Sequence, residues 1–288
     1  MVIRKAVIAA AGLGTRLLPV SKELPKEMLP VFAKNISNKL VIKPLLQLVF
    51  EQLYHVGVKD FCFVVGRGKR AIEDHFTPDW RFVSELIDKG KDEYASDLDA
   101  FYRMIEGSTI VWINQPKPLG FGHAVYQARP FIEEESFLVA AGDTYIVSQN
   151  HEHIVRLLET FSKTDSAVSF LVKKVENPSL YGVVLTELLG DVFRVKSAVE
   201  KSADPPSDLA IMPFYAFKSD IMDALGEIKS DVGGEIQLTD GIQNLIERQL
   251  LVTAVPLNKE EVWLDIGTPE SYWRALEESH NCCNRDIQ

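Results

Sequence analysis

Short apolar segments alternate with longer amphipathic ones along this chain, which is the pattern of a mostly parallel β-sheet covered by helices. The apolar segments predict strands over residues 5–9, 61–65, 109–114, 136–140, 167–173 and 251–256. Apolar residues recur at helical spacing in segments 42–55 and 154–161, which indicates helices that pack on this sheet. Because the carboxyl ends of parallel strands meet at one edge of the sheet, we expect a ligand site there.

Two segments depart from this alternation. The charged segment 77–107 predicts a helical insertion, and segment 183–200 predicts two strands joined by a turn at Gly190-Asp191. We expect residues 1–288 to form a single domain that carries this insertion and a C-terminal helical tail.

The composition and charge narrow the classes of protein to which the chain can belong. Apolar residues make up 46% of the chain, enough for a sizeable core, and 41 acidic against 31 basic residues give a net charge of −10. This acidic balance argues against nucleic acid and against anionic membranes as partners. No segment reaches the roughly 18 consecutive apolar residues of a membrane span, and we expect no secretory leader.

Three cysteines are present, Cys62 in a predicted strand and the adjacent pair Cys282-Cys283 in a polar tail. Their odd number and their spacing argue against a disulfide framework and against a zinc site. We interpret Cys62 as a small buried apolar residue and expect the protein to be cytoplasmic. The sequence assigns no role to Cys282-Cys283.

The first predicted strand leads into a loop of small residues, Ala11-Gly12-Leu13-Gly14-Thr15. Glycines in such a loop let backbone N–H groups approach a phosphate, and we expect a helix to begin here and to add its dipole. The loop does not match the dinucleotide fingerprint, which needs glycine in place of Leu17, nor the phosphate loop that contains Gly-Lys-Ser/Thr. A tight turn without a ligand is the alternative interpretation.

Two basic residues, Arg16 and Lys26, follow this loop among the prolines Pro19, Pro25 and Pro30, which fix the path of the backbone. An Arg offers a planar fork to phosphate oxygens and a Lys a point charge, so together with the loop they indicate a triphosphate site. Solvated surface positions are the less favoured interpretation of both side chains.

The segment that begins at Gly12 has the sequence Gly-Leu-Gly-Thr-Arg-x-x-Pro-x-Ser-Lys-x-x-Pro-Lys-Glu-Met-Leu-Pro. It resembles the opening of the bacterial-type UTP:glucose-1-phosphate uridylyltransferases, within the sugar nucleotidyltransferase superfamily. The resemblance continues in the same order through segments 66–76, 115–124, 142–143, 181–182, 200–201, 233–240 and 265–267. It implies the nucleotide-diphospho-sugar transferase fold, an α/β fold with a Rossmann-like, mostly parallel mixed sheet flanked by helices.

The resemblance implies transfer of a uridylyl group from UTP to α-D-glucose 1-phosphate, with UDP-glucose and pyrophosphate as products. It implies catalytic roles for Arg16, Lys26 and Lys201, and nucleotide contacts for Ala11, Gly12, Gly14, Thr15, Glu27, Gln115 and Gly120. It places the sugar phosphate at Gly182, Glu200 and Lys201, and Mg²⁺ at Asp143 and Asp265.

Asp143 and Asp265 each follow an apolar segment, so we expect both carboxylates at the carboxyl edge of the sheet. Two carboxylates that converge on one cleft suit Mg²⁺, which leaves other coordination positions to water and phosphate. A helix or turn cap is the alternative for each. For the pair Glu200-Lys201 the alternative is an exposed ion pair at the end of a strand.

Other candidate residues leave alternatives open. Gln115 can both donate and accept hydrogen bonds at the edge of a pyrimidine. The acidic Glu27 suits the hydroxyls of a ribose, with a solvated helix flank as its alternative. We interpret His123 as a packing residue at a helix start, and His151 and His153 as residues of a solvated helix start.

Rival functions remain open on the sequence alone. One is glucose-1-phosphate thymidylyltransferase or another sugar-1-phosphate nucleotidyltransferase, and a second is a sugar-nucleotide sensor that binds without turnover. Hydride transfer is a third, weakened by Leu17 in the loop. The two carboxylates Asp143 and Asp265 weigh against the sensor. We expect small-molecule partners and a homo-oligomer, either a dimer or a tetramer.

Overall fold

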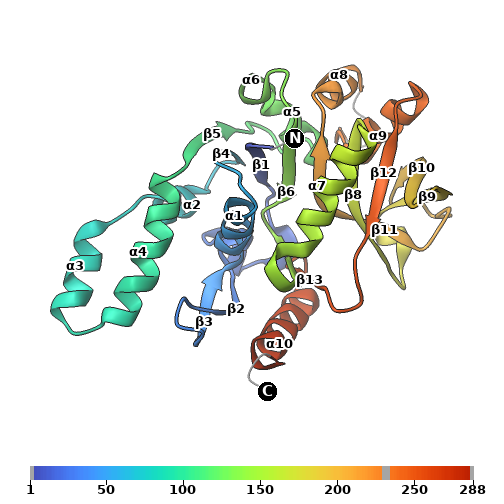
Figure 1. Ribbon diagram of the computed structural model, residues 1–288. Coiled ribbons are helices and arrows are strands. Elements are labelled where there is room, and N and C mark those ends of the chain that lie inside the picture. Colours follow the sequence, from blue (N-terminus) through green and yellow to red (C-terminus); the bar gives the residue numbers. More distant parts are fainter. Residues whose placement is uncertain (1–2, 229–233, 286–288) are drawn as a thin grey trace.

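The computed structural model describes residues 3–228 and 234–285, and one large sheet with helices on both faces dominates it (Figure 1). The strands of this sheet are β1 (Lys5–Ala10), β4 (Asp60–Val65), β5 (Thr109–Asn114), β6 (Phe137–Ala141), β8 (Val168–Lys174), β9 (Gly182–Leu189), β10 (Val192–Glu200), β11 (Leu209–Phe217) and β12 (Val252–Pro256). They lie side by side in the order β5-β4-β1-β6-β11-β8-β12-β10-β9. Two small sheets pair β2 (Pro30–Lys34) with β3 (Leu40–Pro44), and β7 (Thr144–Val147) with β13 (Val262–Asp265).

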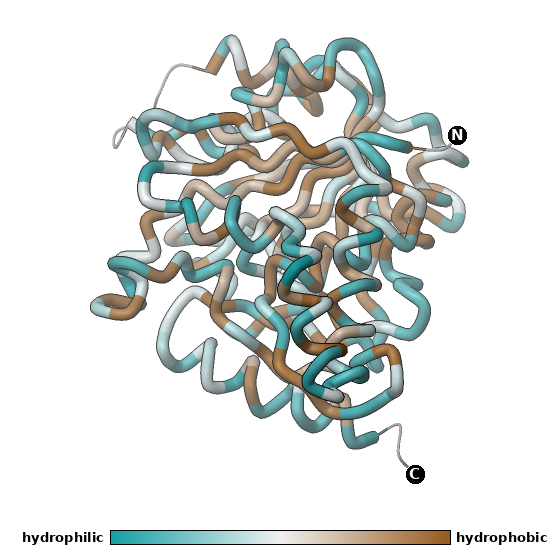
Figure 2. Tube along the Cα trace, turned by 90° about the vertical axis from the view of Figure 1, so that its left-hand side faces the viewer, coloured by the Kyte–Doolittle hydropathy of each residue, from teal (hydrophilic) through white to brown (hydrophobic). Residues whose placement is uncertain are grey.

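Helices cover both faces of the large sheet. The α-helices of the described residues are α1 (Leu45–His55), α2 (Arg70–His75), α3 (Trp80–Asp88), α4 (Asp92–Glu106), α5 (Phe121–Gln127), α6 (Arg129–Ile132), α7 (Glu152–Thr164), α8 (Asp220–Glu227), α9 (Leu238–Glu247) and α10 (Pro269–Arg285), of which α3 packs on α4 and α10 on β2 and β13. Buried side chains of α1, α4 and α7 belong to one apolar core, and those of α5, α8 and α9 belong to a second. Figure 2 shows hydrophobic strand segments running through the interior between more polar outer turns.

The six strands predicted from the sequence are present, and their bounds shift by at most one residue. As expected, β1 pairs in parallel with β4 and β6, and β12 pairs in parallel with β8. By contrast, β11 was not predicted, and it runs antiparallel between β6 and β8. Pro213 lies inside this strand where the register with β8 shifts between Ile211 and Tyr215, so the segment lacks a regular strand pattern.

Two predictions are wrong in detail. Residues 42–44 belong to β3, and α1 begins only at Leu45, because Pro44 disfavours helical geometry in the residue before it. His153 is fully buried in α7 and its Nδ1 atom lies 2.5 Å from Ser148 Oγ, so it is not part of a solvated helix start.

Helices occupy the segments predicted as an insertion and a C-terminal tail, and a turn lies at Gly190-Asp191. The helices α3 and α4 fold as a pair at one side of the molecule (Figure 1). The turn between β9 and β10 contains Gly190 at a φ of 65°, a conformation that favours glycine. The tail is α10, held by a 3.1 Å hydrogen bond from the Tyr272 hydroxyl to the Pro30 carbonyl. Gly233, at the start of segment 233–240, lies outside the described residues.

Within residues 3–228 and 234–285, none of the helices combines the length and the apolar character that crossing a bilayer requires.

Candidate active site

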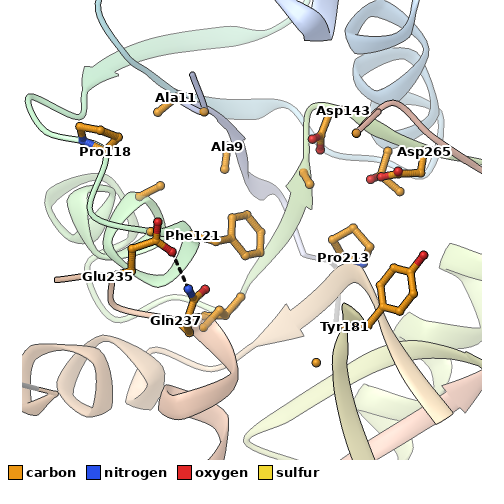
Figure 3. Close-up of a pocket in the computed structure, with 18 of the residues that line it drawn as sticks. Ala9, Ala11, Pro118, Phe121, Asp143, Tyr181, Pro213, Glu235, Gln237 and Asp265 are labelled. Atoms are coloured by element: carbon orange, nitrogen blue, oxygen red, sulfur yellow. Dashed lines mark hydrogen bonds between the residues drawn. The ribbon is translucent and has the colours of Figure 1, made fainter. Parts of the chain in front are cut away.

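A cavity of about 640 Å³ opens where β1, β5 and β6 end (Figure 3). Every residue proposed above for the site lines it: Ala11, Gly12, Gly14, Thr15, Arg16, Lys26, Glu27, Gln115, Gly120, Asp143, Gly182, Glu200, Lys201 and Asp265. The segments that follow β1, β5 and β6 contribute to it, and so do β9, β10 and the end of β13. The cavity therefore lies at the carboxyl edge of the sheet, where the sequence predicts a ligand site.

The loop of small residues after β1 has the open backbone that a phosphate needs, but the expected helix is absent. Gly14 has a φ of 66°, and the Ser21 hydroxyl donates a 2.7 Å hydrogen bond to the Gly14 carbonyl. Only a three-residue 3-10 helix, Thr15–Leu17, follows, because Pro19 has no N–H group with which to continue it. The prediction of a helix dipole is wrong, and phosphate binding would rest on backbone amides and nearby cations.

The two carboxylates are brought together by the small sheet of β7 and β13. Asp143 lies between β6 and β7, and Asp265 is the last residue of β13, where it pairs with Thr144. The Ile266 amide donates a 3.1 Å hydrogen bond to the Asp143 carbonyl and ties the two segments together. Figure 3 shows both carboxylates on the same side of the cavity.

The charges around these carboxylates suit a bound cation. Lys26 forms an ion pair with Asp143. Burial, and then the charge of Asp143, raise the pKa of Asp265 to about 6. No group of three or more His, Cys, Asp or Glu side chains in the described residues is placed to hold a metal. A divalent cation here would take two carboxylates and fill its other positions with water and phosphate, which fits Mg²⁺.

Lys26 lies between acidic side chains. Burial works to lower its pKa, but the charges of Asp143, Glu27 and Asp265 outweigh burial and raise it. The ammonium group therefore stays charged at neutral pH and is suited to bind phosphate oxygens.

Glu27 is buried rather than solvated. Its side chain is 1% exposed, and Lys69 donates a 2.7 Å hydrogen bond to Oε2 of its carboxylate. Burial raises the pKa of Glu27, and the charge of Lys69 opposes that rise. The alternative of a solvated helix flank is therefore wrong, whereas a contact with ribose stays a prediction.

Lys69 was not among the candidate residues, although it lies in segment 66–76. It follows β4 in a loop that packs on the phosphate loop: a Cβ atom at Gly66 would lie 2.9 Å from the Ala11 carbonyl oxygen. Such close approach admits only glycine. The glycines around Lys69 were the available signal, but they did not show which carboxylate it contacts.

Gln115 and Gly120 follow β5, which lies on the other side of β1 from β6, the strand that leads to Asp143. The backbone amide of Gln115 continues the β5 ladder with a 2.8 Å hydrogen bond to the Val65 carbonyl. Gly120 has a φ of 97°, and a Cβ atom there would lie 2.6 Å from the Ile236 carbonyl oxygen. A side chain at position 120 would therefore displace the segment that closes this end of the cavity.

The residues assigned to the sugar phosphate meet at the pairing of β9 with β10. Gly182 pairs with Glu200, and a Cβ atom at position 182 would lie 2.7 Å from Glu200 Oε2. Thr239, which was missed in the sequence, donates a 2.7 Å hydrogen bond to that oxygen. Lys201 Nζ lies 3.3 Å from Glu200 Oε1 and is largely exposed. The Glu200 carboxylate is thus held in place beside an accessible cation.

Aromatic residues complete the wall next to Asp265. The rings of Tyr181 and Trp263 meet edge to face with their centroids 5.6 Å apart, and both line the cavity. They provide apolar surface beside the charged groups, as sugar rings often require. Neither was among the candidate residues, although Tyr181 lies in segment 181–182, because isolated aromatic residues usually belong to a core.

Comparison with known proteins identifies the class of protein. A sequence model described as nucleotidyl transferase matches residues 5–281, and this chain belongs to that family. Among its relatives, the UTP–glucose-1-phosphate uridylyltransferase of Bacillus subtilis (strain 168) is 40% identical over 252 residues, 86% of this chain and 82% of that protein. The uridylyltransferase YngB of the same strain is 36% identical over 251 residues, 86% of this chain and 80% of that protein.

Solved structures agree with this family. A crystal structure of apo UDP-glucose pyrophosphorylase is similar with a TM-score of 0.86 and 29% identity, over 97% of this chain and 99% of that one. A UTP-bound UGPase from Acinetobacter baumannii gives a TM-score of 0.81 and 26% identity, over 96% of this chain and 93% of that one. The predicted α/β nucleotidyltransferase fold is confirmed.

Proposed function

We propose that this chain is a UTP:glucose-1-phosphate uridylyltransferase, which converts UTP and α-D-glucose 1-phosphate into UDP-glucose and pyrophosphate. The observation that carries the proposal is the shared cavity, where the phosphate loop, the pair Asp143 and Asp265, and the cations Arg16, Lys26 and Lys201 meet. Relatives bearing that enzyme's name cover most of the chain and support it.

In the proposed reaction, a phosphate oxygen of glucose 1-phosphate attacks the α-phosphorus of UTP. The new P–O bond forms as the bond to the β-phosphate oxygen breaks, and pyrophosphate leaves. The attacking phosphate is already ionised, so no side chain needs to remove a proton. The chain's own task is to align two anions that repel each other and to offset their charge with Arg16, Lys26 and Lys201.

Asp143 and Asp265 would hold Mg²⁺, which supplies further charge compensation at the phosphates.

The proposal also covers the domain organisation, the location and the assembly of the protein. Residues 1–288 form one catalytic domain in our proposal, since the family match covers residues 5–281. We propose a cytoplasmic location, which suits the buried Cys62 thiol, and a dimer or tetramer as the assembly.

The experiment that tests the function is a pyrophosphate-release assay with UTP, dTTP, CTP, ATP and GTP against several sugar 1-phosphates. We expect UTP with glucose 1-phosphate to give the highest kcat/KM. Preference for dTTP would favour the thymidylyltransferase alternative. Binding of UDP-glucose without release of pyrophosphate from any pair would favour the sensor.

The two anion sites are expected to separate by mutation. Lys201→Ala should raise the KM for glucose 1-phosphate more than that for UTP, and Arg16→Ala should act chiefly on UTP. Each lost charge-assisted contact should cost about 1.5 to 3 kcal/mol. Arg70→Ala, which alters a side chain 88% exposed outside the cavity, is the control. Identical effects of both variants on both substrates would refute these roles.

Glu27 is expected to distinguish UTP from 2′-deoxy-UTP, because Lys69 occupies Oε2 and leaves Oε1 for a ribose hydroxyl. A neutral amide accepts more weakly, so Glu27→Gln should narrow the kcat/KM ratio of the two nucleotides by about fivefold. Competition between the nucleotides measures this ratio, with Glu23→Gln at an exposed position as the control. An unchanged ratio would show that Glu27 does not contact the ribose.

A further inference from the structure

The orientation of the Gln115 side-chain amide is fixed by its surroundings. One amide atom lies 3.1 Å from the Gly120 carbonyl oxygen. A backbone carbonyl can only accept hydrogen bonds, so the amide atom that faces it has to be the nitrogen, Nε2.

The same nitrogen contacts His123. Gln115 Nε2 lies 2.9 Å from Nδ1 of the imidazole, which must be unprotonated to accept its second hydrogen. Both hydrogens of the amide are then used, one by Gly120 and one by His123. The group that remains for a ligand is Oε1, which can only accept, and Gln115 lines the cavity.

His123 is held firmly in the position that this contact requires. It lies in the first turn of α5, and its backbone amide donates a 3.3 Å hydrogen bond to the Ile236 carbonyl. The neighbouring Gly122 approaches the same segment so closely that a Cβ atom would lie 2.7 Å from the Gln237 carbonyl carbon. Burial lowers the pKa of His123, which favours the neutral imidazole. Because Nδ1 accepts, the other ring nitrogen carries the hydrogen, and the Gln127 side-chain amide 3.2 Å away fixes the ring plane by accepting that hydrogen through its oxygen.

Pyrimidine bases differ at the atom that would face Gln115. Uracil and thymine carry a hydrogen on N3, whereas cytosine carries a lone pair there. An amide that presents only its oxygen accepts a hydrogen bond from N3–H of uracil or thymine. The lone pair on N3 of cytosine repels the same oxygen. A site that rejects a ligand by leaving a polar group unpaired discriminates more strongly than one that merely lacks a contact.

We propose that His123 is a positioning residue for base selection: its Nδ1 atom holds the Gln115 amide with Oε1 toward the nucleobase, so that the site takes pyrimidines with N3–H and rejects cytosine. The inference rests on the proposed function, because it assumes that a uridine nucleotide occupies the cavity. The sequence predicts that His123 packs at a helix start. The proposal adds that His123 acts through Gln115 and does not contact the substrate itself.

Two substitutions separate the acceptor at Nδ1 from the bulk of the ring. His123→Phe keeps a ring and removes the acceptor, whereas His123→Asn can place an amide oxygen near the position of Nδ1. His55→Phe is the control, because His55 is an exposed residue outside the cavity. Thermal unfolding of each variant verifies that it is folded.

The measurement is the ratio of kcat/KM for UTP to that for CTP, together with the binding of UTP and CTP by calorimetry in the absence of glucose 1-phosphate. We expect His123→Phe to lower the ratio by about tenfold and His123→Asn to restore most of it, since one hydrogen bond of this kind is at stake. If the role of His123 were merely structural, its substitution would lower kcat/KM and binding equally for UTP and CTP and would leave the ratio unchanged.

The possible results decide the proposal and the function separately. An unchanged ratio in His123→Phe, or an equal loss in His123→Phe and His123→Asn, would overturn the positioning role while the enzyme still used UTP. A wild-type protein that neither binds UTP nor releases pyrophosphate from it would overturn the proposed function. Calorimetry on the wild type therefore distinguishes the two failures.

Discussion

Asp265→Asn is expected to lose about 100-fold or more in turnover and, at the same time, to stabilise the protein in the absence of metal. The activity falls because a ligand proposed to hold Mg²⁺ is removed. The stability rises because burial and the charge of Asp143 raise the pKa of Asp265 to about 6, which means that its charged form is disfavoured in the folded state. The charged carboxylate that we propose to hold Mg²⁺ therefore lowers the stability of the metal-free fold.

The sign of this effect can be measured through its pH dependence. A folded-state pKa above the ordinary value means that the metal-free wild type loses stability as pH rises from about 4 to about 6. We expect Asp265→Asn to lack this loss and to be more stable than the wild type by about 1 to 3 kcal/mol at pH 8. Urea unfolding with a chelator measures the difference, and added Mg²⁺ should stabilise the wild type alone.

Two further variants test whether the effect belongs to Asp265. Asp143→Asn should also lose activity, but it should not stabilise, because it removes the partner of Lys26. Asp74→Asn changes an exposed carboxylate outside the cavity and should alter neither property. Full activity of both Asp143→Asn and Asp265→Asn at limiting Mg²⁺ would contradict the metal assignment.

Lys69→Met is expected to destabilise the fold by about 3 to 5 kcal/mol, a large fraction of a typical domain's stability. The substitution leaves the Glu27 carboxylate buried without the cation 2.7 Å away. The double variant Glu27→Leu with Lys69→Met should recover much of the loss, because an apolar pair of similar volume carries no unpaired charge. Urea unfolding of the wild type, Lys69→Met, Glu27→Leu and the double variant measures the coupling.

Lys22→Met provides the matched control for this pair. Lys22 lies four residues before Lys26, and its ion pair with Glu23 has side chains 76% and 86% exposed. Exposed pairs contribute little to stability, so we expect little change in this variant. Equal effects of Lys22→Met and Lys69→Met would show that the buried pair is not special.

Much of the fold could be predicted because its strands are short apolar segments bounded by polar residues. The pattern failed where one residue overrode it. Pro213 interrupts β11 at a change of register, so the strand between β6 and β8 had no regular signature. Pro44 moved the start of α1, and the prolines after Leu17 replaced the expected helix with a short 3-10 turn.

The site could be predicted where its signals are local, and not where they depend on distant partners. Asp143 and Asp265 both follow apolar segments, but nothing in either segment shows that β7 pairs with β13. Likewise, the sequence around Glu27 does not distinguish a buried carboxylate from an exposed one, because burial is decided by Lys69 on another loop. The same limit applies to His123, whose contact with Gln115 depends on the turn at Gly120.

The pairing of β13 with β7 also determines how late in synthesis the cavity acquires its second carboxylate. A nascent chain that has emerged from the ribosome through residue 201, just after β10, already contains the phosphate loop, Asp143 and the residues assigned to the sugar phosphate. Asp265 is translated much later, and until β13 docks on β7 the second carboxylate is missing from the cavity. If Asp265 holds Mg²⁺ as we propose, unfinished chains would consume no UTP, and the first turnover would follow the synthesis of nearly the last segment.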